Sequence, residues 1–211
     1  MNNFLLRLPN WLTYLRLALI PVFVVLMIDP TQGAVLLATV VFIIAAVTDY
    51  TDGYIARRYG AVSDAGKLLD PMADKILVLS ALVMLVAQRS DLTGDPWVPG
   101  WMVVLVLARE IWVTGLRGIA GSRGIVVAAT QSGKYKSGFQ MVSIVFLLLH
   151  EVTFPLAGQR ISCQTIGVNL LFFSIVISYW GAIEYTFTVL GDEKKTIASS
   201  DKSTPSAENP S

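Results

Sequence analysis

The sequence predicts an all-α integral membrane protein with six transmembrane helices and a short N-terminal helix at the membrane interface. Of the 211 residues, 54% are hydrophobic, and the mean hydropathy of +0.62 exceeds what a soluble domain of this size needs. Six apolar segments each approach the roughly 20 residues that cross a hydrocarbon core as a helix. Backbone groups in lipid must be satisfied within the segment, and the alternation of a membrane β-barrel is absent, so helices are expected.

The predicted elements follow one another closely along the chain. Apolar residues between Phe4 and Leu8 favour a short helix that lies in the interface before the first span. Asp29-Pro30 and Gly94-Asp95-Pro96 are typical of turns and separate neighbouring spans. The six spans are predicted over residues 11–28, 34–57, 67–88, 99–119, 134–152 and 166–190.

The chain is predicted to hold one membrane domain, residues 1–190, followed by a disordered cytoplasmic tail, residues 191–211. The tail is rich in Ser, Pro, Lys and Glu and cannot bury a core. The N-terminus does not resemble a cleaved signal peptide, so the chain is taken as mature. A net charge of +1 indicates no nucleic-acid partner.

Lysine and arginine are distributed unevenly between the two ends of the predicted bundle. One end has only Arg89 and Arg160, while the other carries most of the cations outside the spans. By the positive-inside rule, the cation-rich end and both termini face the cytoplasm. The cations at that end, apart from the tail lysines, are Arg7, Arg57, Arg58, Lys67, Arg117, Arg123, Lys134 and Lys136.

Four carboxylates are expected to meet at the cytoplasmic ends of the second and third spans. Asp49 and Asp52 are three residues apart, and Asp70 and Asp74 are four apart, so each pair shares a helix face. A short loop joins the two spans, which makes them antiparallel neighbours. All four acids can therefore converge just beneath the cytoplasmic interface, where acidic groups are costly and usually functional.

Four converging carboxylates repel one another unless some are protonated or cations lie between them. Oxygen ligands without His or Cys suit Mg²⁺ or Mn²⁺. Two such ions typically serve transfer at a phosphorus centre. The alternative is that the acids cap helix ends or pair with Arg57, Arg58 and Lys67; four acids on two converging faces make this alternative the weaker one.

The pattern Asp49-x2-Asp52-Gly53-x2-Ala56-Arg57-x8-Gly66-x3-Asp70-x3-Asp74 resembles the signature of the CDP-alcohol phosphotransferase family without a departure. The segment from Leu8 to Arg16 is similar to the family's first-helix motif. The segments around Arg109-Glu110-Ile111 and Gly133-Lys134-Tyr135-Lys136-Ser137 resemble the branch that makes phosphatidylglycerophosphate. The likeness covers most of the chain up to about Gln140.

The resemblance implies roles for individual residues. Asp49, Asp52 and Asp70 would hold two divalent metal ions, and Asp74 would also reach the metal site and act as general base; spacing alone does not rank the four acids. The alternatives are helix packing for the small residues, an interfacial anchor for Arg57, and capping of the first span for Asn10 and Thr13. The residues that would bind the CDP-lipid are Asn10, Thr13, Gly53, Ala56, Arg57 and Gly66.

A second set of residues favours an anionic acceptor. Arg109 lies deep in an apolar span and needs an anionic partner, while its neighbour Glu110 is expected to point elsewhere. Arg117 shares the face of Arg109, and Lys134 and Lys136 stand at a helix N-terminus, where cations are unfavourable unless an anion binds. These four cations predict a phosphate-binding pocket that faces the carboxylates; flanking positive-inside charge is the alternative.

In the predicted reaction, CDP-diacylglycerol and glycerol 3-phosphate react to give phosphatidylglycerophosphate and CMP. The reaction is expected at a bacterial inner membrane. The resemblance also implies a homodimer. One alternative is the same chemistry with another acceptor, such as inositol phosphate or serine. An alternative of another class is a divalent-cation transporter, but the outer halves of the spans are almost wholly apolar and offer no polar pathway.

Overall fold

The computed structural model describes residues 3–59, 64–90, 94–122, 132–156 and 159–201. Within these ranges, side chains are described for residues 11–48, 72–90, 94–122, 137–155 and 160–191. The described residues form six helices and a two-stranded hairpin, and each predicted span falls largely within one helix. The elements are α1 (Asn3–Leu26), α2 (Gln32–Tyr59), α3 (Asp64–Ala87), α4 (Gly100–Ser122), α5 (Ser132–Leu148), β1 (Thr153–Leu156), β2 (Gln159–Ser162) and α6 (Cys163–Asp201).

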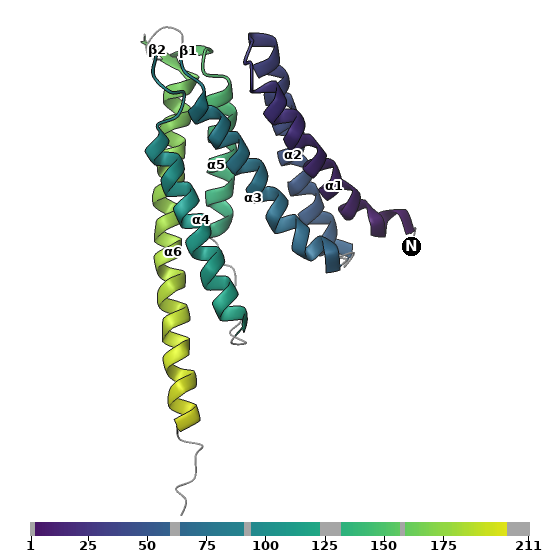
Figure 1. The fold of residues 1–211 in the computed structure, drawn as a ribbon, viewed down its shortest axis with the longest axis vertical. Coiled ribbons are helices and arrows are strands. Elements are labelled where there is room, and N and C mark those ends of the chain that lie inside the picture. The colour runs from purple at the N-terminus through teal and green to yellow at the C-terminus, as the bar shows by residue number, and fades with distance from the viewer. Residues whose placement is uncertain (1–2, 60–63, 91–93, 123–131, 157–158, 202–211) are drawn as a thin grey trace, which may run out of the picture.

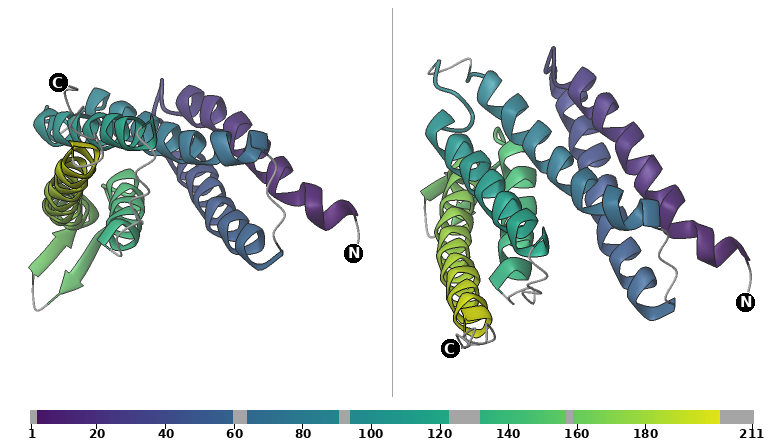
Figure 2. Two further views of the ribbon diagram at one scale, coloured as in Figure 1. Left: turned by 90° about the horizontal axis from the view of Figure 1, so that it is seen from below. Right: turned by 60° about the horizontal axis from the view of Figure 1, so that its bottom comes forward.

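The helices form two groups, α1–α3 and α4–α6, which meet along α2 and α3 (Figure 1). Helix α1 packs on α2 and α3, while α6 packs on α5 and α4; α3 also contacts both α4 and α5. Figures 1 and 2 show that the end of α2, the start of α3, the end of α4 and the start of α5 all point towards one end of the bundle. The sequence segments predicted to carry the carboxylates and the basic pocket therefore lie at the same end.

The first and last helices are longer than predicted. The expected interfacial helix is continuous with the first span in α1, which bends near its N-terminus (Figure 1). Pro9 lies in this region, where its ring removes a backbone donor and favours a bend. Helix α6 continues to Asp201, into the segment expected to be disordered, because Glu, Lys and Ala favour helix even where apolar residues end. Residues 202–211 lie outside the described residues.

The hairpin between α5 and α6 is a departure from the purely helical prediction. Strands β1 and β2 pair antiparallel, with Thr153 opposite Ser162 and Leu156 opposite Gln159. The amide of Cys163 donates to the carbonyl of Val152 at 2.8 Å, which closes the hairpin directly onto α6. Four-residue strands, one containing Pro155, give too weak a periodic pattern to be seen in the sequence.

Two turns were predicted correctly, one before the second span and one after the third span. Asp29 and Pro30 lie between α1 and α2. Gly94 precedes α4 with a φ of 72°, in the left-handed region that glycine adopts without a steric cost.

Close packing rather than water exclusion holds helices together in lipid, and small residues make it possible. Gly167 of α6 lies against Leu147 of α5, so closely that a Cβ at position 167 would come within 2.7 Å of Leu147 Cγ. The hydroxyl of Ser143 donates to the carbonyl of Gly167 at 2.8 Å across the same contact. On the other side of the bundle, the rings of Phe23 and Phe42 join α1 to α2 with centroids 6.0 Å apart.

The outward faces of the helices are apolar. Trp11 on α1, Leu36 on α2, Ile111 on α4, and Trp180 and Phe187 on α6 are among many large apolar side chains that are well exposed. Such continuous exposure is unusual in a soluble monomer.

Within the described residues, one segment, Cys163–Gly191, is both long and apolar enough to cross a membrane. Three further apolar helical segments are shorter: Trp11–Leu26, Gln32–Thr48 and Ser137–Leu148. Helices α3 and α4 carry charged residues within their length.

Candidate active site

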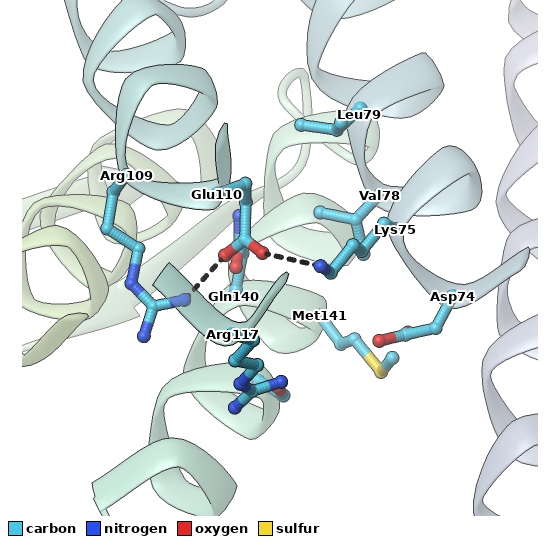
Figure 3. A pocket seen from close by; sticks show the side chains of 10 residues that line it. Asp74, Lys75, Val78, Leu79, Arg109, Glu110, Arg117, Gln140 and Met141 are labelled. Carbon is cyan, nitrogen blue, oxygen red and sulfur yellow. Dashed lines mark hydrogen bonds and ion pairs between the residues drawn. The ribbon is translucent and has the colours of Figure 1, made fainter. Parts of the chain in front are cut away.

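A cavity of about 180 Å³ lies between α3, α4 and α5. It brings Asp74, predicted as a metal ligand and base, into one pocket with Arg109 and Arg117, predicted to bind a phosphate (Figure 3). The two sites predicted separately therefore share a pocket at least through these three residues. Its full lining is Asp74, Lys75, Val78, Leu79, Arg109, Glu110, Arg117, Ser137, Gln140 and Met141.

The expectation that Glu110 points away from Arg109 is wrong. Nη1 of Arg109 lies 2.9 Å from Oε1 of Glu110, and both side chains are largely buried, at 12% and 13% exposure. Successive helical residues differ by about 100° in direction, but the long arginine side chain spans that angle and turns its guanidinium back to the carboxylate. Burial of both groups makes this pairing favourable, because an isolated charge there would lose its hydration.

Glu110 is also the centre of a network that joins three helices. Its other oxygen, Oε2, lies 3.9 Å from Nζ of Lys75 on α3 (Figure 3). The Lys75 ammonium also donates to the hydroxyl of Thr114 at 2.6 Å. Nε of Arg109 donates to the backbone carbonyl of Ser178 on α6 at 3.2 Å. The network thus joins α3 to α4 beside the pocket and α4 to α6.

Arg109 and Arg117 differ in how many of their donors are occupied. A guanidinium has five N–H donors, and the contacts of Arg109 with Glu110 and Ser178 leave others for a ligand. Arg117 forms no ion pair with any residue whose side chain is described; its guanidinium lies 5.9 Å from the ring centroid of Tyr185 on α6. Arg117 is therefore a cation held at the pocket by an aromatic face, ready for an anion.

Asp74 is half-buried and faces the pocket from α3. Asp70 precedes it by four residues on α3, and Asp49 and Asp52 lie in the last part of α2. The side chains of these three acids are outside the described part of the structure, so the predicted convergence of all four remains a prediction.

The donor chemistry fits a hard divalent cation, because all four predicted ligands are carboxylates. Among the described side chains, no group of three or more His, Cys, Asp or Glu residues could hold a metal ion. Only Asp74 of the four predicted ligands belongs to that searched set.

Of the residues predicted to bind a CDP-lipid, only Thr13 has a described side chain, and it is buried within α1. Because α1 begins at Asn3, Asn10 and Thr13 lie inside the helix, and the alternative in which they cap its start is wrong. The remaining predicted residues lie in helices, but their side chains are outside the described part of the structure: Asn10 in α1, Gly53, Ala56 and Arg57 in α2, Gly66 in α3, and Lys134 and Lys136 in α5.

Three polar residues that line the pocket, Lys75, Ser137 and Gln140, were not among the predicted site residues. Lys75 follows Asp74 directly, and a lysine inside a predicted span is itself a signal of function. Ser137 and Gln140 lie one helical turn apart on α5, and with Met141 they form a face whose spacing was readable from the sequence. The lining as a whole has three cations and two carboxylates, which suits an anionic ligand placed next to a carboxylate.

Comparison with known proteins gives a match over most of the chain. The profile of the CDP-alcohol phosphatidyltransferase family matches residues 6–183, further than the resemblance recognised up to Gln140. A CDP-diacylglycerol–glycerol-3-phosphate 3-phosphatidyltransferase of Bacillus subtilis is 39% identical over 186 residues, which cover 82% of this chain and 92% of that protein. Proteins with the same name are 39% identical in Rickettsia bellii (68% of this chain, 75% of that protein) and 34% identical in Sodalis glossinidius (89% and 97%).

The Glu110 network predicts a measurable loss of stability when its carboxylate is neutralised. Glu110→Gln leaves Arg109 and Lys75 close together without their shared anion, and we expect the free energy of unfolding to fall by about 1–3 kcal/mol. Adding Lys75→Met should recover part of that loss, since the two sites are coupled. Unfolding in detergent, followed by circular dichroism, measures both effects.

The matched control is Glu151→Gln. Glu151 is 59% exposed and lies 3.9 Å from His150, so its neutralisation should change stability by less than about 0.5 kcal/mol. Equal losses of unfolding free energy for Glu110→Gln and Glu151→Gln would show that the Glu110 network stabilises the fold no more than an exposed ion pair.

Proposed function

This chain belongs to the CDP-alcohol phosphatidyltransferase family, and from this membership we propose that it transfers the phosphatidyl group of CDP-diacylglycerol to glycerol 3-phosphate. The products are phosphatidylglycerophosphate and CMP, and the reaction is a step of phospholipid synthesis. The observation that carries the proposal is the pocket in which Asp74 faces Arg109 and Arg117. It offers a base for a hydroxyl and cations for a phosphate, and glycerol 3-phosphate has both groups.

The chemical step is a substitution at the phosphorus that bears the lipid. Asp74 accepts the proton of the primary hydroxyl, and the hydroxyl oxygen forms a bond to that phosphorus. The bond from the same phosphorus to the CMP oxygen breaks, and CMP leaves with the electron pair. A base must lie within hydrogen-bond reach of its hydroxyl, and the position of Asp74 in the lining of the pocket supports this role.

The CDP-lipid side of the site consists of residues on α1, α2 and α3. Asp49, Asp52, Asp70 and Asp74 would hold two ions of Mg²⁺ or Mn²⁺. When bound, such ions neutralise the pyrophosphate and its leaving group. Small residues would let the cytidine lie against the helices, and polar residues would contact the pyrophosphate; the set is Asn10, Thr13, Gly53, Ala56, Arg57 and Gly66.

The acceptor side consists of cations on α4 and α5. Arg109 and Arg117 line the pocket and would bind the phosphate of the acceptor, since charge-assisted bonds to guanidinium are strong and directional. Lys134 and Lys136 lie in the first turns of α5 and would complete the same phosphate site.

In this proposal the chain crosses a bacterial inner membrane six times, with both termini and the active site facing the cytoplasm. The apolar outward faces, from Trp11 to Phe187, support burial in lipid. The cations of the predicted cytoplasmic end support the orientation. Residues 1–190 are the membrane domain, residues 191–211 are the cytoplasmic tail, and a homodimer is the assembly that family membership suggests.

An acceptor panel tests the proposed reaction. Purified protein, CDP-diacylglycerol and Mg²⁺ or Mn²⁺ should release CMP with glycerol 3-phosphate, and at least about tenfold more slowly with inositol phosphate or serine. CMP release is measured by chromatography, and the lipid product by mass spectrometry. Activity with inositol phosphate alone would reject glycerol 3-phosphate, and metal flux into vesicles without CMP release would favour a transporter.

Asp74→Asn should abolish turnover while the protein still folds. The change removes the base and one carboxylate ligand, and the loss of a base alone slows a reaction by roughly 10²- to 10⁴-fold. Asp29→Asn, in the turn between α1 and α2 and away from the pocket, is the matched control and should keep full CMP release. Substantial turnover by a folded Asp74→Asn protein would remove Asp74 from the role of base.

Arg117→Gln should selectively weaken binding of the acceptor, glycerol 3-phosphate. Loss of a charge-assisted bond to phosphate should raise the KM for glycerol 3-phosphate by about tenfold or more, while the KM for CDP-diacylglycerol changes by less than about twofold. Arg117 is a cleaner choice than Arg109, which also bonds Glu110 and Ser178. Arg160→Gln, in the hairpin, is the control, and equal effects on both substrates would reject the phosphate assignment.

A further inference from the structure

Gln140 is a buried residue of the pocket whose amide nitrogen has no hydrogen-bond partner. Its side chain on α5 is only 4% exposed, and Nε2 has no partner. The other described glutamine and asparagine amides all donate: Gln88 to Met27 O at 2.7 Å, Gln164 to Trp97 O at 3.2 Å, Asn169 to Thr165 O at 2.8 Å and Gln32 to Glu151 at 3.0 Å. Gln140 is thus the exception among the amides that the structure describes.

An unsatisfied buried amide is unfavourable for the fold, so its presence needs another explanation. A leucine of similar size would fill the same volume without a polar group to satisfy. Gln140 lines the cavity together with Arg109, Glu110 and Lys75, as labelled in Figure 3. An amide that faces a cavity is ready to bond to a ligand in it.

The cavity is of the right scale for a small acceptor. Its volume of about 180 Å³ leaves room for a small polar molecule of several non-hydrogen atoms. Asp74 on α3 and the arginines on α4 lie on different walls, and Gln140 is on α5, a third wall.

The chemistry of each wall selects a different group of the acceptor. In glycerol 3-phosphate, the phosphate suits the arginines and the primary hydroxyl suits Asp74, which leaves the secondary hydroxyl at carbon 2. A hydroxyl both donates and accepts a hydrogen bond, and so does a neutral amide. A charged group in this place would instead favour a second ionic substituent.

Resting on the proposed function, we propose that Gln140 is a specificity-determining residue that hydrogen-bonds the 2-hydroxyl of glycerol 3-phosphate. Gln140 takes no part in proton transfer. It distinguishes the natural acceptor from a phosphorylated alcohol without that hydroxyl, because a bound analogue leaves the buried amide unsatisfied.

The test compares glycerol 3-phosphate with 3-hydroxypropyl phosphate, which lacks only the 2-hydroxyl, in the full-length enzyme with CDP-diacylglycerol. The wild-type protein should prefer glycerol 3-phosphate by roughly 10- to 100-fold in kcat/KM. Gln140→Leu should lose most of that preference, through a lower kcat/KM for glycerol 3-phosphate and an almost unchanged value for the analogue. Gln164→Leu, the same substitution at the hairpin end of α6, should keep the wild-type ratio.

Stability provides a second measurement that separates recognition from a structural role. Because the Gln140 amide is unsatisfied, Gln140→Leu should melt at the same temperature as the wild-type protein or higher in the absence of substrates. Gln140→Met, which retains an unbranched side chain, provides a second test and should lose the acceptor preference in the same way.

The outcomes are distinguishable. If both variants keep the wild-type ratio, or lose activity equally with both acceptors, the role of Gln140 is rejected while the proposed reaction stands. If the wild-type protein releases no CMP with glycerol 3-phosphate, the proposed reaction fails and the role of Gln140 fails with it. A collapse of the ratio in both variants with an unchanged ratio in Gln164→Leu supports the assignment.

Discussion

The ion pairs of Glu110 are the interaction on which the arrangement of the pocket depends. Charged groups among apolar helices lose their hydration, and the cost falls only when they are paired and hydrogen-bonded. Glu110 meets Arg109 at 2.9 Å and Lys75 at 3.9 Å, and Arg109 reaches the backbone of Ser178. Two of the three helices that line the cavity, α3 and α4, are therefore joined to each other, and α4 is also joined to α6.

Carboxylates and cations of both α3 and α4 line the cavity: Asp74 and Lys75 on α3, and Arg109, Glu110 and Arg117 on α4. Asp74 therefore faces the same space as the two arginines. In the proposed reaction, the phosphate of the acceptor would lie at the arginines and its hydroxyl at Asp74. Such an arrangement would position the hydroxyl for attack, an effect on rate that comes from orientation as well as from binding.

Much of the fold was predictable because lipid limits the choice of structure. An apolar segment of about 20 residues has few alternatives to a helix, and turns such as Asp29-Pro30 punctuate the helices. The length of α6 was not predictable from hydrophobicity, since its last residues are polar but form helix through local hydrogen bonds.

The pairing of Glu110 with Arg109 was missed because spacing gives the direction of a Cβ, not the reach of a long side chain. Lys75 and Gln140 each left a signal in the sequence, but only the packing of α3, α4 and α5 shows that they line one pocket.

The pairing of Glu110 with Arg109 favours anion binding rather than blocking it. Two donors of the guanidinium are engaged by Glu110 and Ser178, and the fork retains others that are now fixed in direction. A free arginine would lose about 2 kcal/mol of rotamer entropy when it binds an anion, whereas Arg109 is already ordered by its partners. Glu110 lowers the net positive charge of the pocket but also holds Arg109 in place, so preorganisation offsets part of the lost attraction. Arg117, which has no ion pair with a described residue, then supplies the charge that Glu110 does not neutralise.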